Sequence, residues 1–385
     1  MQLDDFDFNL PPDQIAQHPV EPRDASRMLR LERSSGAFYD AVFRDLPEFL
    51  HSGDLLVFNE TRVIPARLHG NRLGPRSGAA RDPRRSIARH GHGNGEAGKV
   101  ASPPGRVEVL LLERLQSDLW NCLVRPGRKL PVGEALRFDP PGASVPDCLP
   151  VMTGEIVGRG ERGMRQIRLQ WQGDFYERLN EVGETPLPPY ISRAGSPAGD
   201  ARDRERYQTV YARTAGSSAA PTAGLHFNSA MLDRLRAIGV ELTFINLQIG
   251  LGTFQPVDAD KIARRQLHRE SYEIPPDAAA AVTAARRQHR RILAVGTTAL
   301  RALEACARVH AGEVAPGAGA TDLFLMPGDD FLVVNGLLTN FHLPRSSLLM
   351  LVSAFAGRDS VLRAYRHAVQ SGYRFFSYGD CMLIL

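Results

Sequence analysis

The middle of the chain is a block of short strands that interrupts a longer region of alternating strands and helices. Between residues 107 and 171, short apolar or alternating runs are separated by Gly and Pro turns at close spacing. That pattern is typical of a small antiparallel barrel or sandwich. On both sides, strand-like runs alternate with helical patterns, which is typical of a layered α/β domain. We therefore predict a discontinuous α/β domain at 1–64 and 173–385, interrupted by the small β domain at 65–172.

Residues 71–106 within that block differ in composition from the rest. They hold seven glycines, four prolines, eight Lys or Arg and two Asp or Glu, and no aromatic residue. Such a stretch cannot bury enough apolar surface to become ordered, so we expect a disordered insertion. It carries a charge of +6, and subtracting this from the net charge of +4 leaves −2 for the remainder. Global charge is therefore weak evidence for nucleic-acid binding, although a local basic arm is compatible with it.

Composition also disfavours several classes of protein. The four cysteines are scattered without a CxxC pair, so neither a disulfide framework nor a zinc site is expected. No apolar run approaches the ~20 residues of a membrane helix. The N-terminus is acidic, unlike a signal peptide. We expect a cytoplasmic protein with no membrane contact and no metal.

The segment AAPTAGLHF at 219–227 is unusual as either core or loop. Pro221 fixes one backbone angle, and Gly224 allows a close approach or a positive φ. Thr222 and His226 supply polar groups, and a helical pattern follows directly. The segment predicts a tight loop that leads into a helix N-terminus, where free N–H groups attract anions. A rigid structural turn with a hydrogen-bonded histidine explains the same residues.

Further polar motifs follow predicted strands or precede predicted helices. Ligands sit at the carboxyl ends of strands in open α/β sheets, and a helix start offers N–H groups to an anion. Plain corners and helix caps are the alternative. One of these motifs ends a predicted hairpin about Asn335-Gly336. The candidate binding residues in these motifs are Asn59, Arg62, Gly252, Thr253, Thr297, Thr298, Asn340 and His342.

Two sets of residues offer acid–base chemistry. Asp380, near the C-terminus, suits a base or a turn carboxylate. In HRESYEI, His268, Glu270 and Tyr272 occupy alternate positions, so a strand would place them on one face. That arrangement suits proton transfer, and it is equally ordinary as a hydrated strand face. The sequence contains no metal-ligand spacing, nucleophile elbow or Walker motif, so its residue types favour a polar organic substrate handled without metal.

Several segments, taken together and in order, resemble the S-adenosylmethionine:tRNA ribosyltransferase-isomerase family of queuosine biosynthesis. They are GDLLVFNETRVIPARL, YQTVYA, AAPTAGLHF, GLGTFQPV, AVGTTALRALE, TNFHLPRSSLLMLVSAFAG and YRFFSYGD. The resemblance spans nearly the whole chain and implies a three-layer α/β domain interrupted by a β-barrel domain. It implies transfer of the ribosyl group of S-adenosylmethionine to 7-aminomethyl-7-deazaguanine at the tRNA wobble position. Isomerisation then gives epoxyqueuosine, and adenine and methionine are released.

The resemblance also implies roles for the motif residues. A sulfonium acidifies the neighbouring ribose carbon, so a positioned base can start the reaction. His226 or Asp380 is expected to transfer protons, and His268 and Glu270 are further acid–base candidates. S-adenosylmethionine is the implied ribosyl donor, tRNA is the implied partner, and a monomer is expected. Substrate contacts are expected from Asn59, Arg62, Thr222, Ala223, Gly224, Gly252, Thr253, Asn340 and His342, and carboxylate contacts from Thr297 and Thr298.

The chain also departs from the family pattern. Gln248 stands where the family commonly has His, and Ser347 stands where Thr is usual. The insertion at 71–106 is extra, so it is either an added electrostatic contact to tRNA or a species-specific loop, which we favour. An S-adenosylmethionine-dependent RNA methyltransferase is an alternative, but it would need a glycine-rich turn that GDLLVFNETR lacks. A non-catalytic RNA-binding protein would interleave basic and aromatic residues, which the basic stretch does not.

Overall fold

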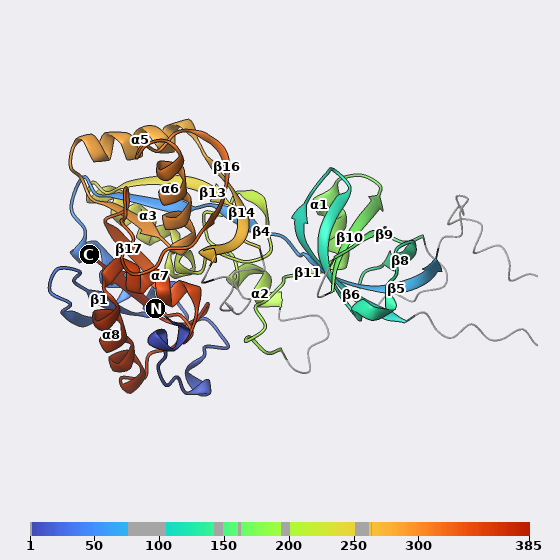
Figure 1. Cartoon of the computed structure of the whole chain (residues 1–385), viewed down its shortest axis with the longest axis horizontal. Coiled ribbons are helices and arrows are strands. Elements are labelled where there is room, and N and C mark those ends of the chain that lie inside the picture. Colours follow the sequence, from blue (N-terminus) through green and yellow to red (C-terminus); the bar gives the residue numbers. More distant parts are fainter. Residues whose placement is uncertain are drawn as a thin grey trace, which may run out of the picture. The chain divides into compact units, whose positions relative to one another are not determined.

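In the computed structural model the chain forms two units, shown in sequence colours in Figure 1. The structure describes residues 2–75, 105–141, 149–160, 163–193, 201–250, 262 and 264–385. The larger unit comprises Met1–Val63, Leu187–Ser196 and Asp200–Leu385, and the smaller one comprises Ile64–Pro186 and Pro197–Gly199. One unit thus interrupts the other in sequence, as the change of pattern predicts.

Nine of the described strands form the sheet of the larger unit. The four central strands β13, β3, β15 and β17 run parallel, so their carboxyl ends lie at the same edge. Strands β14 and β18 run antiparallel to the outer members of that group. In spatial order the strands are β16 (Gly317–Leu323), β14 (Gln266–Ile274), β13 (Glu241–Leu247), β3 (Leu55–Asn59), β15 (Ile292–Val295), β17 (Gly336–Asn340), β18 (Cys381–Ile384), β1 (Arg27–Leu31) and β2 (Phe38–Val42).

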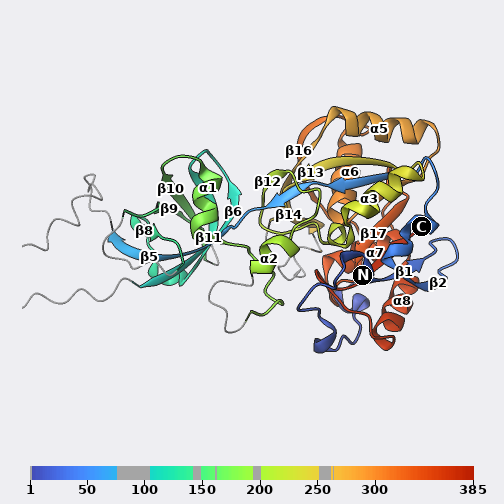
Figure 2. The same cartoon turned by 180° about the vertical axis from the view of Figure 1, so that it is seen from behind.

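Alternate residues of the central strands belong to apolar clusters on opposite faces of the sheet. Leu55 and Val57 of β3 belong to one cluster, whereas Leu56 and Phe58 belong to another. Helices on both faces bury the strand completely, which explains why its sequence is apolar throughout. The predicted three-layer α/β fold is confirmed (Figure 1 and Figure 2). The first cluster includes α5 (Pro276–Arg287), α6 (Thr297–Val309), α7 (Ser347–Ala356) and α8 (Arg358–Gln370), and the second includes α3 (Ser229–Ala237) and the 3-10 helix η4 (Phe43–Phe49).

Two short strands and one short helix complete the larger unit beside this sheet. Strand β4 (Thr61–Val63) pairs in parallel with β12 (Thr214–Ser217). Helix α2 (Ala201–Arg206) precedes β12. Strand β4 begins two residues after β3 ends, so the NETR motif (59–62) spans the end of β3 and the start of β4.

Six antiparallel strands close the barrel of the smaller unit, and β8 pairs with β5 to complete the ring. Trp120, Cys122 and Val124 of β7 alternate into the buried interior. The predicted antiparallel barrel is confirmed. Around the ring the strands are β5 (Arg67–Pro75), β6 (Arg106–Arg114), β7 (Leu119–Arg125), β10 (Met164–Trp171), β9 (Met152–Arg159) and β8 (Glu134–Phe138); α1 (Phe175–Val182) and β11 (Gly183–Glu184) follow β10.

Helix α1 packs on the barrel rather than on the larger unit's sheet. The Phe175 ring centroid lies 5.6 Å from that of Trp120 and 4.8 Å from that of Trp171. The smaller unit therefore extends to Pro186, past the boundary expected at residue 172. The physical reason is that aromatic side chains on both sides of that boundary share one buried cluster.

The edges of the expected insertion also differ. Residues 71–75 complete β5 and Arg106 begins β6, because Asn71 pairs with Arg106 and the rest of β5 pairs with β8. These flanks are strands, not loop. The remainder of the insertion, 76–104, lies outside the described residues.

The predicted hairpin about Asn335-Gly336 is wrong. Strand β17 pairs in parallel with β15 and antiparallel with β18, and residues 332–334 form no strand before it. The backbone N–H groups of 332–334 instead donate to the buried Glu304 carboxylate of α6 at 2.8–3.0 Å. A carboxylate far away in the sequence therefore takes the place of a hairpin partner.

Candidate active site

The larger unit contains a cavity of about 430 Å³ at the carboxyl ends of β15 and β17. Its wall combines the start of the 3-10 helix η8 (Thr222–His226), the starts of α6 and α7, and the residues that follow β17. The lining side chains are mainly apolar or hydroxyl-bearing, and among the described ones none is a carboxylate. Arg345 is the charged member, and its guanidinium pairs with Asp7 at 2.6 Å. Such a wall suits a small organic molecule that is held by apolar contacts and a few hydrogen bonds.

Two helix N-termini open onto the cavity. Gly296, with φ at +92°, turns the chain from β15 into α6, and it has no side chain to cap the helix. Thr297 and Thr298 follow it and line the cavity. Ser346 caps α7 by accepting the N–H of Leu349, and it also lies in the wall. Unbonded N–H groups and the helix dipoles make both starts electropositive, so they attract a carboxylate or phosphate.

Asn340, at the end of β17, lines the cavity, and its side-chain carbonyl oxygen has no hydrogen-bond partner among the described residues. Its amide nitrogen donates to the carbonyl of Phe376 at 3.1 Å and lies 3.2 Å from Nε2 of His226. The Phe376 carbonyl can only accept, so the orientation of the amide is fixed. The Oδ1 atom is buried and has no partner among the described residues. A buried acceptor without a partner costs free energy, so this atom stands out among the polar groups near the cavity.

His226 lies behind Asn340 and does not line the cavity. Its Nδ1 is 2.6 Å from Oγ of Ser26, which in turn donates to the carbonyl of Arg23. Burial, together with the charges of Arg374 and Arg23, lowers the pKa of His226 to about 3. The imidazole is therefore neutral, with Nε2 accepting from Asn340 and Nδ1 donating to Ser26.

His342 does line the cavity, two residues beyond Asn340. Its Nε2 is 3.0 Å from Oγ1 of Thr339, and its backbone N–H donates to the Tyr365 hydroxyl at 3.1 Å. Burial lowers the pKa of His342 to about 3. The cavity thus contains a neutral imidazole, which is the form that can accept a proton.

Strained backbone also marks this wall. Phe376 has φ at +75° and Arg345 has φ at +56°, although neither is glycine. Such conformations cost roughly 1–3 kcal/mol each and concentrate at functional sites. The Phe376 ring packs on Tyr190 at 4.0 Å between centroids, and the Tyr190 hydroxyl bonds to Ser377. Phe376 is also the residue whose carbonyl accepts from the Asn340 amide.

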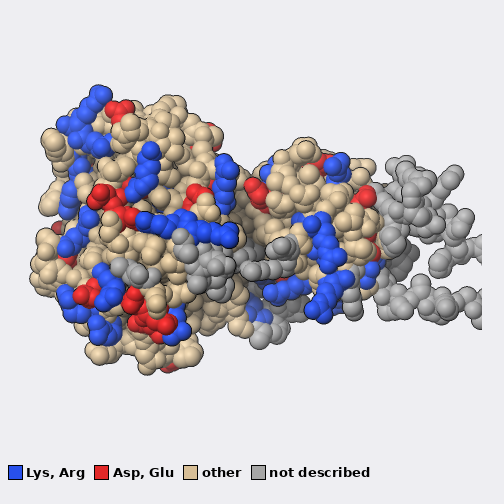
Figure 3. Space-filling view, viewed as in Figure 1, with Lys and Arg blue, Asp and Glu red and all other residues tan. Residues whose placement is uncertain are grey.

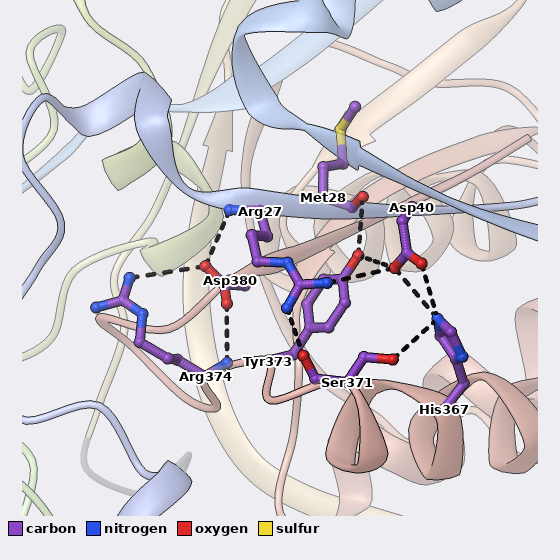
Figure 4. Close-up of polar contacts among 8 residues, drawn as sticks. All are labelled: Arg27, Met28, Asp40, His367, Ser371, Tyr373, Arg374 and Asp380. Carbon is purple, nitrogen blue, oxygen red and sulfur yellow. Dashed lines mark hydrogen bonds and ion pairs between the residues drawn. The ribbon is translucent and has the colours of Figure 1, made fainter.

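Asp380 has a different position from the one expected of a base. Its Oδ1 accepts the backbone N–H of Arg27 at 3.0 Å, and its Oδ2 accepts that of Arg374 at 2.8 Å (Figure 4). The Arg374 guanidinium also forms an ion pair with Oδ1, at 3.6 Å. The carboxylate is buried and absent from the cavity wall. It ties the start of β1 to the turn before β18, which is the turn-carboxylate alternative.

The strand that carries His268 and Glu270 lies outside the cavity wall. Glu270 is buried and forms an ion pair with Arg301 of α6, whereas His268 is exposed. The pairing of β14 with β16 is irregular between Gln266 and Glu270. The structure therefore does not bring these two residues to the other candidates.

Some of the remaining predicted binding residues line the cavity, and others lie behind it or elsewhere. Thr222 and Ala223 line the cavity, as do Thr297, Thr298, Asn340 and His342. Asn59 lies behind Thr298, with its amide nitrogen 3.4 Å from Oγ1 of that residue. Gly224 is required for a different reason, because a Cβ there would lie 2.0 Å from the Tyr211 hydroxyl. Arg62 is exposed on β4, and Gly252 and Thr253 lie outside the described residues.

The start of α3 does not supply the anion site expected from the 219–227 segment. Asn228 caps that helix by accepting the N–H of Met231 at 2.8 Å, and neither residue lines the cavity. The helix starts that line the cavity belong to α6 and α7 instead. Sequence reasoning overlooked Tyr190, Ser346 and Ser377 as wall residues, although the pair Ser346–Ser347 before an apolar run is a helix-start signal.

Among the described residues, no group of three or more His, Cys, Asp or Glu is placed to hold a metal ion. Within the same part of the chain, no helix has both the length and the apolar character needed to cross a membrane.

Comparison with known proteins gives matches over the whole chain. The model of a family described as queuosine biosynthesis protein matches residues 3–384. Two relatives named S-adenosylmethionine:tRNA ribosyltransferase-isomerase are 47% identical, from Heliobacterium modesticaldum, and 48% identical, from Symbiobacterium thermophilum. Both alignments cover 100% of this chain and of the relative. A crystal structure of S-adenosylmethionine tRNA ribosyltransferase from Thermotoga maritima matches with a TM-score of 0.51 at 34% identity, covering 99% of this chain and 100% of that one.

Proposed function

Because the chain belongs to the queuosine biosynthesis protein family, we propose that it transfers the ribosyl group of S-adenosylmethionine to tRNA and isomerises it. The observation that carries this proposal is the full-length similarity to named ribosyltransferase-isomerases. Following the family resemblance, 7-aminomethyl-7-deazaguanine at the wobble position becomes epoxyqueuosine, and adenine and methionine leave. Neither a methyltransferase nor a non-catalytic RNA-binding protein fits a match of that extent. The cytoplasmic location and the monomeric state stay predictions.

The cavity is the proposed site for S-adenosylmethionine. Its volume of about 430 Å³ lies in the ~300–1,000 Å³ range of small-molecule sites. The starts of α6 and α7 suit the methionine carboxylate, because both present unbonded N–H groups to the same space. The hydroxyls of Thr297 and Thr298 add donors at that point.

Asn340 is the proposed partner of a donor group on the substrate, either a ribose hydroxyl or the adenine amine. Its Oδ1 is the unpaired acceptor, and His226 and the Phe376 carbonyl hold its amide. His226 is therefore a positioning residue rather than a proton carrier. His342 takes its place as the proposed base for the acidified ribose carbon, since it lines the cavity. The bound substrate must raise its pKa from about 3 towards neutrality for it to take up that proton.

The test is mass spectrometry of tRNA carrying 7-aminomethyl-7-deazaguanine after incubation with S-adenosylmethionine and the protein. We expect the mass gain of epoxyqueuosine, with adenine and methionine released in equal amounts. Unchanged tRNA from a folded protein would reject the proposed function. Wild-type turnover by His342→Ala would leave the function standing and reject His342 as the base.

A further inference from the structure

One end of the barrel carries a groove of about 600 Å³ lined by arginines. Arg125 ends β7 and Arg159 ends β9, and the start of β10 lies between these two strands in the sheet. Arg165 of β10 lies directly opposite Arg159 in the register. Like charges placed directly opposite each other on neighbouring strands destabilise a sheet unless something compensates them. The positive charges of Arg159 and Arg165 at this groove therefore repel each other.

Arg165 forms the floor of the groove. It is only 3% exposed, and its guanidinium donates to the backbone carbonyls of Gly127, Leu130 and Met164. No carboxylate pairs with it in the described part of the barrel. Burial and the nearby charge of Arg159 lower the pKa of Arg165, as expected for a cation without a counter-ion. The three carbonyls accept hydrogen bonds from the guanidinium but leave its positive charge without an ionic partner, which buried charges normally have.

The rim of the groove is also unneutralised. Arg125, Arg128 and Arg159 are exposed, and among the described residues none of them is in an ion pair. Other barrel arginines differ: Arg72 pairs with Glu134 at 2.9 Å and Arg137 with Asp139 at 2.6 Å. Lys and Arg side chains gather on the face of the smaller unit that is visible in Figure 3.

The remaining wall indicates what kind of anion fits. Glycines take up much of it, and Gly127 and Gly163 approach so closely that a Cβ on Gly127 would lie 3.3 Å from the Cα of Gly163. The described lining contains no aromatic residue on which a base could stack, and no amide or carboxylate side chain to read a base edge. Such a wall favours contact with phosphates and not with bases.

We propose that this groove binds the ribose-phosphate backbone of tRNA, with Arg165 at its floor and Arg125, Arg128 and Arg159 at its rim. The inference rests on the proposed function, which makes tRNA the substrate. The contact is independent of sequence, so recognition of the modified base belongs to other parts of the molecule. Neutralised phosphates release counter-ions, so binding at this groove depends steeply on salt.

The test compares two triple variants of the full chain. Arg125→Gln, Arg128→Gln and Arg159→Gln remove the rim charges, and the control, Arg44→Gln, Arg287→Gln and Arg366→Gln, removes three exposed charges from the larger unit. Binding of tRNA is measured by fluorescence anisotropy from about 50 to about 400 mM KCl, a range over which phosphate contacts are progressively screened. For the rim variant we expect binding at low salt to be weaker by at least about tenfold. We also expect the slope of log affinity against log salt to fall by about 2–3, at about 0.7–0.9 per phosphate contact. The control should stay within about threefold of wild type.

Lysine replacements and turnover complete the design. The Lys triple variant retains the charges, so it should restore the slope, whereas a purely structural role of the arginines would not be rescued. The Gln triple variant should raise KM for tRNA and leave kcat unchanged. A rim variant with the wild-type slope would overturn the groove proposal. A wild-type protein that converts no tRNA would instead overturn the proposed function, so the two failures are distinguishable.

Discussion

The cavity of the larger unit and the groove of the barrel both attract negative charge, but they use different groups to do it. The cavity relies on backbone N–H groups at two helix starts and on hydroxyls, and its charged member, Arg345, is already paired. The groove relies on whole guanidinium charges without acidic partners among the described residues. Buried partial charges act over short distances and fix geometry, whereas exposed full charges act over about a Debye length of ~10 Å and set affinity for a polyanion. The difference fits the proposed ligands, S-adenosylmethionine with its single carboxylate in the cavity and tRNA with its many phosphates in the groove.

The strongest test of the cavity is Asn340→Asp. The change keeps an acceptor oxygen but replaces the amide N–H groups with an oxygen that faces the Phe376 carbonyl and His226. We expect kcat/KM to fall by about 100- to 1,000-fold, or roughly 3–4 kcal/mol of transition-state stabilisation. The new carboxylate should also raise the pKa of His226, which NMR titration of its ring protons would detect. The matched control is Asn228→Asp, which keeps a helix cap and should retain turnover. Normal turnover of the Asn340→Asp variant would remove Asn340 from the site.

Acidification tests the two neutral histidines. The pKa values of His226 and His342 are lowered from 6.5 to about 3 in the folded protein, so between these pH values the unfolded chain binds more protons. Stability is therefore complete above about pH 6.5 and falls as the pH drops. At about pH 5 each histidine should cost about 2 kcal/mol of unfolding free energy. Urea unfolding at about pH 7 and about pH 5 measures this cost. His226→Gln should lose its share of the pH dependence, while exposed His51→Gln should keep the wild-type profile. Equal profiles for all three proteins would contradict a neutral buried His226.

Salt separates the two regions directly. Raising KCl from about 50 to about 200 mM should weaken tRNA binding by at least about tenfold, since several phosphate contacts are screened together. Binding of S-adenosylmethionine should change by less than about twofold, because the cavity is buried and its partial charges are screened little. Isothermal titration with each ligand at both salt concentrations gives the comparison. An equal salt response for both ligands would show that the two regions do not differ in the way described.

The smallest expected effect concerns the turn into α6. Gly296→Ala places a side chain at φ of +92°, with its nearest neighbour 3.6 Å away, so strain rather than a clash is the cost. We expect about 1 kcal/mol of lost stability. Turnover should fall severalfold, because the helix start that lines the cavity shifts. Gly312→Ala is matched, with the same φ of +92° and no neighbour within 4 Å. The Gly312→Ala variant should lose similar stability in thermal unfolding and keep full activity. If it lost as much activity as the Gly296→Ala variant, Gly296 would have no specific role in the site.

Local sequence patterns were sufficient where burial is complete or alternation is strict. The run Leu55–Phe58 is apolar on both faces because helices cover both, and β7 of the barrel alternates because one of its faces is less buried than the other. The patterns failed where a distant side chain decides. Glu304 captures the backbone of 332–334, and no spacing near Asn335 reveals it.

The site shows the same division. Motifs at strand ends and helix starts singled out Thr297, Thr298 and Asn340, which line one cavity because the chain places them at one edge of the sheet. The motifs did not distinguish residues that line the cavity from residues that hold the lining residues in place. His226 and Asp380 are equally polar in sequence, but their roles depend on partners more than a hundred residues away. Gly224 is a glycine because of Tyr211, which no local pattern indicates.

The way in which the barrel closes has a consequence for engineering and for evolution. Strands β5 and β6 are direct neighbours, and β5 then continues along β8, so the pairings among the described strands already close the ring. Shortening that connection to a few residues would alter the loop-closure entropy by only about 2 kcal/mol. The position is therefore a natural point of genetic insertion, where a lineage or an experimenter can add, remove or exchange a segment, such as a fluorescent reporter, without disturbing the strand register on either side.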